Sequence, residues 1–262
     1  MRSLPTCVLG CLLIGAGTAC AQYTFITNNG AITITGSTAQ GSVSIPSTIN
    51  GLPVKIVGNG GLVFTGATLT NLTIPDSVTT IGASAFENSD NLANVTIGNG
   101  VNSIGISAFE GCFSLTNVTI GAGLTNLSQY AFEYCSDLAS ISFAGNAPAL
   151  GYFVFDSDPV TVYFLPGTTG WGSTLGGAPT TYWLLPWPVI LNPGFTGTAQ
   201  NRQFGFTVSW ATSATVVVDG CTNLLNPVWQ PLQTNTFSTG SFQFGDSQQA
   251  NTVRRFYRVR SQ

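Results

Sequence analysis

Hydrophobic residues in the middle of the chain recur with a period of 23 residues. The first column is leucine throughout, and further apolar columns follow it in the same register. Their members are Leu69, Leu92, Leu115 and Leu138; Leu72, Val95, Val118 and Ile141; Ile74, Ile97, Ile120 and Phe143; Val78, Val101 and Leu124; Ile81, Ile104, Leu127 and Leu150; and Phe86, Phe109, Phe132 and Phe155. A fixed period of this length is typical of units that bury their apolar edges only by stacking on one another. The pattern therefore predicts a solenoid.

Each unit begins with a short alternating run, such as Leu115 to Ile120, in which apolar and polar residues take turns. Strict alternation is typical of a strand with one buried face. Gly or Pro follows the run, at Pro75, Gly98 and Gly121, and indicates a turn. Stacked units predict a mainly β fold, in which the strands form one parallel sheet and the phenylalanine column fills the core.

The period ends at a proline-rich segment, 184–194, which we interpret as a hinge. Five short runs of alternating or β-branched residues follow it, separated by turn residues. These runs are Phe204–Trp210, Thr215–Val218, Val228–Leu232, Ser241–Phe244 and Arg255–Val259. Such spacing predicts a small antiparallel β-sandwich over residues 195–262.

The first residues have the pattern of a secretory signal peptide. Met1-Arg2 is a short positive start, Leu4 to Gly17 is apolar and small, and Ala19-Cys20-Ala21 offers a cleavage site after Ala21. Lipidation of Cys20 is a less favoured alternative, because such a site prefers a larger residue than Gly17. No later stretch supplies the roughly 20 apolar residues of a membrane-spanning helix. We expect export, with residues 1–21 as the signal, 22–68 as an N-terminal cap and irregular first repeat, and 69–183 as solenoid and closing segment.

Charged residues are scarce, which narrows the classes of function. They make up 6% of the chain against a usual share of about a quarter, and histidine is absent. Without histidine there is no Ser-His-Asp or Cys-His arrangement and no histidine metal ligand. Seven basic and ten acidic residues also argue against a nucleic-acid partner. We expect neither an enzyme nor a cofactor.

The repeat motif L-x-x-[LV]-x-I-[PG]-x-x-[VL]-x-x-[IL]-x-x-x-A-F-x-x-[CS] resembles the BspA-like leucine-rich repeat family. Three full copies cover Leu69–Asn91, Leu92–Ser114 and Leu115–Asp137, and a fourth degrades at Ala144–Ala147. Repeats of this family occur in exported bacterial surface proteins. The resemblance implies a leucine-rich repeat solenoid that binds or adheres to an extracellular protein or glycan, with a passive envelope component as the alternative.

The residues that alternate with the buried ones predict an uncharged strip on the sheet face, which is the candidate ligand-binding surface. Its members are Asn71, Thr73, Asn94, Thr96, Asn117, Thr119, Ser140 and Ser142. Solenoids commonly bind ligands on such faces. The alternative is purely structural, because threonine suits a solvated strand and asparagine ladders hydrogen-bond along a stack.

A row of acids directly follows the core phenylalanines, at Glu87, Glu110, Glu133 and Asp156. Carboxylates about 5 Å apart repel one another, so the row is either a hydrated edge or a calcium-binding ridge. A glycosidase would need two carboxylates in different environments, whereas a repeat column makes its members equivalent. We therefore do not assign the row to catalysis.

Two further groups of residues carry candidate roles. Cys112 and Cys135 lie one repeat apart, and packing favours buried thiols over a disulfide between adjacent turns. Four arginines cluster near the C-terminus, at Arg254, Arg255, Arg258 and Arg260. They are candidates for attachment to a polyanionic surface, although charge that guards an edge strand is the commoner reason for such a cluster.

Overall fold

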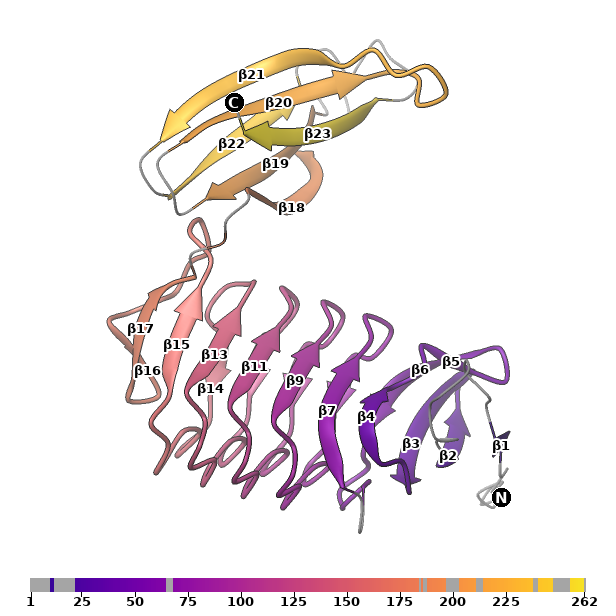
Figure 1. Cartoon of the computed structure of the whole chain (residues 1–262). Helices are drawn as coiled ribbons and strands as arrows, with labels where there is room; N and C mark the ends of the chain where they lie inside the picture. Colours follow the sequence, from indigo (N-terminus) through magenta and orange to yellow (C-terminus); the bar gives the residue numbers. More distant parts are fainter. Residues whose placement is uncertain are drawn as a thin grey trace. The chain divides into compact units, whose positions relative to one another are not determined.

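The computed structural model describes residues 10–11, 22–64, 68–183, 185, 188–196, 203–210, 214–237, 240–246 and 255–261. The chain divides into two compact units, which are described separately (Figure 1). The first contains Met1–Phe164 and Thr169–Thr181, and the second contains Leu165–Thr168 and Tyr182–Gln262. In these ranges no helix is long and apolar enough to span a membrane.

The first unit is the predicted solenoid, and its main ladder is an eight-stranded sheet. The strands in spatial order are β4 (Gly41–Ser44), β7 (Leu69–Ile74), β9 (Asn94–Ile97), β11 (Asn117–Ile120), β13 (Ser140–Phe143), β15 (Thr161–Phe164), β17 (Ala178–Tyr182) and β16 (Thr174–Leu175). From β7 to β13 the pairing is parallel, and each residue lies beside its equivalent one period away, as Asn94 lies beside Asn71 and Asn117. The predicted fold class is confirmed.

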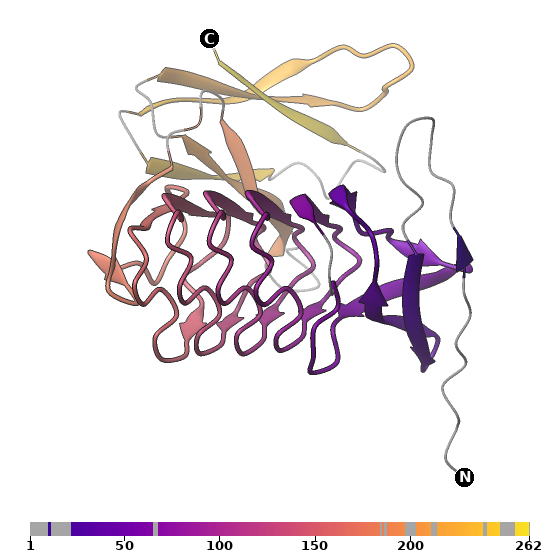
Figure 2. The same cartoon turned by 60° about the horizontal axis from the view of Figure 1, so that its bottom comes forward.

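A second ladder, which the sequence pattern did not predict as a sheet, runs along the other side of the coil (Figure 2). Its repeating strands are β6 (Leu52–Val57), β8 (Thr80–Ile81), β10 (Ser103–Ile104), β12 (Asn126–Leu127) and β14 (Ala149–Leu150). Neighbours in this series are parallel. Strands of two residues are too short to show alternation, so the sequence indicated only a returning segment there.

The N-terminal end of the solenoid is covered by a hairpin of β2 (Gln22–Asn28) and β3 (Ala31–Ser37). Asn29 and Gly30 connect them with φ of 49° and 74°, the left-handed conformation that two-residue hairpin turns require. β3 then pairs with β6 in parallel, and β5 (Thr48–Ile49) pairs with β6 on a side path of the same sheet. β1 (Gly10–Cys11) pairs with β2, whereas the rest of the predicted signal peptide lies outside the described residues.

Glycine at the predicted turn allows successive turns to approach closely. A Cβ on Gly98 would lie 2.6 Å from the backbone nitrogen of Asp76, one turn earlier, and a Cβ on Gly121 would lie 2.6 Å from that of Asn99. Such contacts are far inside van der Waals distance, so the backbone of each turn occupies the space that a side chain would need. Glycine at these two positions is therefore required for the turns to stack this closely.

The core of the solenoid is a stack of parallel phenylalanine rings. Phe86, Phe109 and Phe132 are at most 1% exposed, and neighbouring ring centroids are 5.1 Å apart. The stack extends to Phe64 at 5.1 Å and to Phe155 at 6.1 Å. Offset ring contacts of this length are favourable beyond their area of burial. The predicted phenylalanine core is confirmed.

The second unit consists of two three-stranded antiparallel sheets. One contains β18 (Val189–Thr196), β19 (Gln203–Trp210) and β22 (Gly240–Asp246), and the other contains β21 (Gln230–Phe237), β20 (Ala214–Cys221) and β23 (Phe256–Ser261). A separate hydrophobic core includes Phe206, Val208, Val216, Val218 and Phe244. β18 lies largely within the segment interpreted as a hinge. It tolerates Pro193 because it is an edge strand with an irregularity between Leu191 and Gly194.

Candidate functional site

The candidate ligand-binding residues form one continuous strip on the main ladder. We call this set, listed above as eight residues from Asn71 to Ser142, the Asn/Thr strip. Its members alternate with the buried residues of β7, β9, β11 and β13 and so face away from the core. The first five are exposed, and Thr119, Ser140 and Ser142 are half-buried. The strip carries no charge.

Side-chain hydrogen bonds connect the asparagine row from turn to turn. Asn94 Nδ2 donates to Asn71 Oδ1 at 2.9 Å, and Asn117 Nδ2 donates to Asn94 Oδ1 at 3.2 Å. Ser140 Oγ continues the series by donating to Asn117 Oδ1 at 2.7 Å. These bonds fix the orientation of the amides, and each amide group can form further bonds because it has two donors and two acceptor lone pairs. The surface is thus a preorganised, uncharged array of hydrogen-bonding groups.

The acidic row lies on the turn side of the solenoid, with one carboxylate in each turn. Glu87, Glu110 and Glu133 are half-buried, and Asp156 is exposed. Burial and the charges of Glu110 and Asp156 raise the pKa of Glu133 above its usual value. Within the described ranges, no three His, Cys, Asp or Glu side chains converge so that they could hold a metal ion. Calcium binding by the row stays a prediction alongside the hydrated edge.

The two repeat cysteines are free and buried, which confirms the thiol ladder. Cys112 Sγ donates to the carbonyl of Phe86, and Cys135 Sγ donates to the carbonyl of Phe109, both at 3.2 Å. Hydrogen bonding to Cys112 and burial raise the pKa of Cys135, so this thiol is held in its unreactive protonated form.

Asp158 occupies the next position in the same column, where its two carboxyl oxygens are buried. Burial raises its pKa to about 7, and the charges of Asp156 and Glu133 act in the same direction. Asp158 also lines an open pocket of about 540 Å³ with Phe153, Asp156, Pro159 and Gly176. The pocket forms where the last repeat meets β16 and β17. Because residues 174–182 do not follow the 23-residue period, the sequence did not indicate this pocket.

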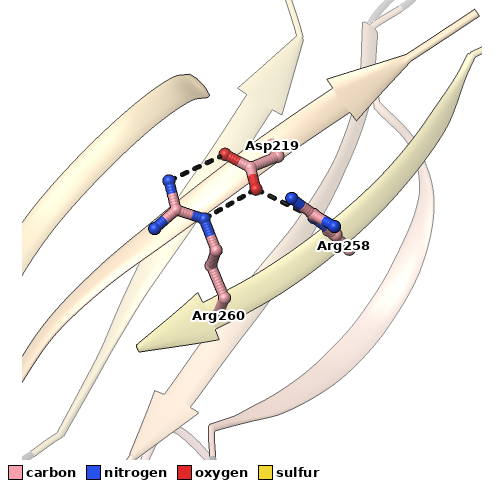
Figure 3. Close-up of polar contacts among 3 residues, drawn as sticks. All are labelled: Asp219, Arg258 and Arg260. Carbon is pink, nitrogen blue, oxygen red and sulfur yellow. Dashed lines mark hydrogen bonds and ion pairs between the residues drawn. The ribbon is translucent and has the colours of Figure 1, made fainter. Parts of the chain in front are cut away.

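Three of the four C-terminal arginines are paired with two buried aspartates. Arg258 Nε and Arg260 Nε contact Asp219 Oδ2 at 2.9 and 2.8 Å, and Arg260 Nη2 contacts Asp219 Oδ1 at 3.4 Å (Figure 3). Asp219 is 1% exposed in its side chain, whereas the two arginines are 47% and 43% exposed. Burial alone would raise the pKa of Asp219, but the hydrogen bonds and charges of the two arginines outweigh it and lower the pKa.

Of the other two predicted arginines, Arg255 is paired and Arg254 is not described. Arg255 Nη1 contacts Asp246 Oδ2 at 2.6 Å, and Asp246 is also buried. Arg254 lies outside the described residues. β23 is an edge strand of its sheet; Arg258 and Arg260 on this strand, and Arg255 just before it, neutralise aspartates on other strands. Sequence reasoning missed these aspartates, although an acid directly after Val216-Val-Val218 was an available signal.

The second unit also has an aromatic pocket of about 360 Å³. Phe195, Phe204 and Tyr257 line it together with Ile190 and Pro193. The rings of Phe204 and Tyr257 stack at 5.2 Å, and Tyr257 Oη donates to Asp246 Oδ2 at 2.8 Å. The ion pair and this hydrogen bond thus tie the pocket wall to β22.

The repeat length, the parallel ladder with its polar outer strip and the stacked phenylalanine core define the first unit as a leucine-rich repeat solenoid. Residues 60–169 match the family model of the BspA type leucine rich repeat region, in six copies. This region of the chain therefore belongs to the BspA-type leucine-rich repeats.

Solved structures of bacterial leucine-rich repeat proteins are similar to the chain. A leucine rich repeat protein from T. pallidum is 26% identical, with 54% of this chain and 68% of that chain covered and a TM-score of 0.48. A leucine rich cell surface protein from Faecalibacterium prausnitzii is 24% identical, with 71% and 60% covered and a TM-score of 0.36. The pneumococcal vaccine antigen PcpA is 17% identical, with 66% and 53% covered and a TM-score of 0.39. No curated protein matches the chain significantly.

Proposed function

We propose that the protein is exported, resides at the cell surface or outside the cell, and binds an extracellular protein or glycan without catalysing a reaction on it. The N-terminal signal pattern and the BspA-type repeats support export. The Asn/Thr strip is the surface that we assign to the ligand. The observation that carries this assignment is the exposed, uncharged row of amides and hydroxyls, kept in register over four turns.

The chemistry of the strip suits a neutral, extended polymer. Equivalent side chains on adjacent strands are about 5 Å apart, so a linear ligand can meet the same pair of groups at each turn. Amide and hydroxyl groups both donate and accept hydrogen bonds, which fits sugar hydroxyls and peptide groups alike. The ordered asparagine row would lose little side-chain entropy on binding, which favours affinity.

A passive structural role is the second candidate, and one observation favours it. The amides of Asn71, Asn94 and Asn117 already hydrogen-bond to one another along the stack. A ladder of this kind stabilises the solenoid even if nothing binds to it.

Probing an array of glycans and matrix proteins with the purified protein separates the two candidates. We expect a saturable signal that Thr96→Arg and Thr119→Arg abolish, because each places a long charged side chain on the strip. Asn102→Arg is the matched control, since it adds the same charge at an exposed turn position outside the strip. A blank array would support the passive role, whereas a signal that both strip variants retain would show that the ligand binds another surface.

A further inference from the structure

The turns that carry the acidic row become aromatic in the last two repeats. In the first two repeats one turn position is held by Ser84 and Ser107, and in the next two it is held by Tyr130 and Phe153. All four residues have positive φ, between 54° and 61°. A second position changes from Asn88 and Gly111 to Tyr134, again at positive φ, and is Ser157 in the last repeat. Bulky residues are rare in this conformation, whereas Asn and Gly adopt it readily. The aromatic residues therefore stand where local backbone preference disfavours them.

Core packing does not account for these aromatic side chains. Tyr134, Tyr152 and Phe153 are 49%, 77% and 59% exposed. The rings of Tyr130 and Phe153 stack in parallel with centroids 5.9 Å apart, at an interplanar angle of 2°. The neighbouring turns are also joined by backbone hydrogen bonds from Tyr130 to Tyr152 and from Tyr134 to Asp156, at 3.1 and 3.2 Å. Exposed aromatic side chains gathered on adjacent turns are typical of an interaction site.

The acidic row passes through the same turns. Glu133 lies between Tyr130 and Tyr134 in sequence, and Asp156 follows Phe153. In the described part of the chain, the three ion pairs all belong to the second unit, so the row has no basic partner there. The raised pKa of Glu133 reflects the repulsion of Glu110 and Asp156 in addition to burial. We name the set Tyr130, Glu133, Tyr134, Tyr152, Phe153 and Asp156 the aromatic-acidic edge.

The edge continues into the open pocket at the end of the repeats. Phe153 and Asp156 belong to both, and Pro159, Gly176 and Gly177 form part of the pocket lining beyond them. The pocket is large enough for one long side chain, because its volume of about 540 Å³ is within the range of small-ligand sites. A linear partner can thus run across the stacked rings and place a side chain in the pocket.

We propose that the aromatic-acidic edge binds an extended polypeptide segment rich in lysine or arginine. Cationic side chains meet both features of the surface, since they pair with carboxylates and are attracted to the faces of aromatic rings. They also relieve the repulsion within the row, which an uncharged sugar would leave in place. This surface is separate from the Asn/Thr strip, so the inference does not depend on the function assigned to the strip.

Fluorescence anisotropy with a labelled decapeptide of alternating lysine and glycine tests the proposal. At about 50 mM salt we expect saturable binding that Tyr134→Asn and Phe153→Ser each weaken by about two- to fivefold, as loss of one cation–π contact predicts. Glu133→Gln should weaken binding more than either aromatic replacement does. Both aromatic replacements restore residues that earlier turns hold at the same position, so their melting temperatures should not fall.

Three controls make the outcome decisive. Thr96→Gln changes the Asn/Thr strip and should leave binding unchanged, and the corresponding glutamate–glycine decapeptide should not bind. The proposal is overturned if the lysine peptide does not bind saturably, or if Tyr134→Asn, Phe153→Ser and Glu133→Gln bind it as the wild type does. Competition by uncharged maltohexaose at the edge would also overturn it, because that result identifies a sugar surface.

Discussion

Asp158 illustrates how a position in a repeat column determines the chemistry of a residue. The column begins with buried Ser89, Cys112 and Cys135, and the two thiols donate hydrogen bonds to backbone carbonyls of the preceding turn. An ionised carboxylate has no proton to donate, whereas a protonated one does. The buried oxygens of Asp158 and its pKa of about 7 fit a carboxyl group that stays protonated to a higher pH in the folded protein than an exposed aspartate does.

Asp158 should make the first unit less stable as the pH rises. The pKa of an aspartate in an unfolded chain is about 3.9, whereas the folded value is about 7. Between these values the folded state binds more protons than the unfolded state, so the free energy of unfolding falls from about pH 4 to about pH 7. Asp158→Asn should flatten this dependence and stabilise the first unit at pH 8 relative to the wild type. Urea unfolding midpoints at pH 5 and pH 8 measure the effect.

Asp137→Asn is the matched control, because Asp137 is exposed one turn earlier and its replacement leaves the buried carboxyl in place. The control should retain the wild-type slope. Equal slopes for wild type and Asp158→Asn would contradict the assignment of the pH dependence to this group.

At the scale of residues, the direction of most side chains was predictable and their partners were not. Alternation placed Asn94 and Thr96 on the outside and Val95 on the inside, because a strand has a period of two. The burial of Cys112 and Cys135 was predictable because a free cysteine behaves as a small hydrophobic residue. The pairing of Arg258 and Arg260 with Asp219 joins residues about 40 positions apart, and no local pattern records such a contact.

At the scale of elements, the phenylalanine stack makes each turn dependent on its neighbours. Phe109 has ring neighbours at 5.1 Å on both sides, whereas Phe155, at the end of the column, contacts Phe132 at 6.1 Å and is 5% exposed. In a solenoid the total stability is close to a sum of units and the interfaces between adjacent units. A change in a middle turn therefore affects two interfaces.

Phe109→Ala should destabilise the first unit by about 3–5 kcal/mol, because it leaves a cavity in a core that cannot collapse around it. Phe155→Ala should have a smaller effect, since the end position has one stacked neighbour and more room to relax. Chemical denaturation of both variants, followed by hydrogen exchange to locate the loss of protection, measures the difference. A larger loss for Phe155→Ala than for Phe109→Ala would contradict the stacking model.

The elements that the sequence predicted share a long, repeated signal, and those it missed lack one. The strands of the main ladder recur in register and alternate clearly, so one unit supports the assignment of the next. After β6, the strands of the second ladder have only two residues, as in Ser103–Ile104. β18 was obscured by Pro193, because proline normally argues against a strand and here lies at an irregular edge. The pocket beside Asp156 arises where repeated and unrepeated segments meet, which a period cannot show.

At the scale of the whole molecule, the few charged residues lie in separate groups. The Asn/Thr strip is neutral, and the acidic row has no basic partner among the described ion pairs. The two arginines of β23 pair with buried Asp219 of the second unit instead. In a chain with 6% charged residues, this distribution concentrates unbalanced negative charge at the acidic row. Ionic strength should therefore distinguish the surfaces of the first unit.

Raising the salt concentration from about 50 mM to about 500 mM should weaken binding of the lysine–glycine decapeptide strongly, because the Debye length then falls below the roughly 10 Å found at 0.1 M. Glu133→Gln should reduce the slope of affinity against salt, since it removes one carboxylate from the row. Thr96→Gln should leave the slope unchanged. A ligand that binds the Asn/Thr strip should show little salt dependence, because that surface carries no charge. Anisotropy titrations at four salt concentrations measure each slope, and a salt-independent affinity for the lysine peptide would show that the acidic row does not hold it.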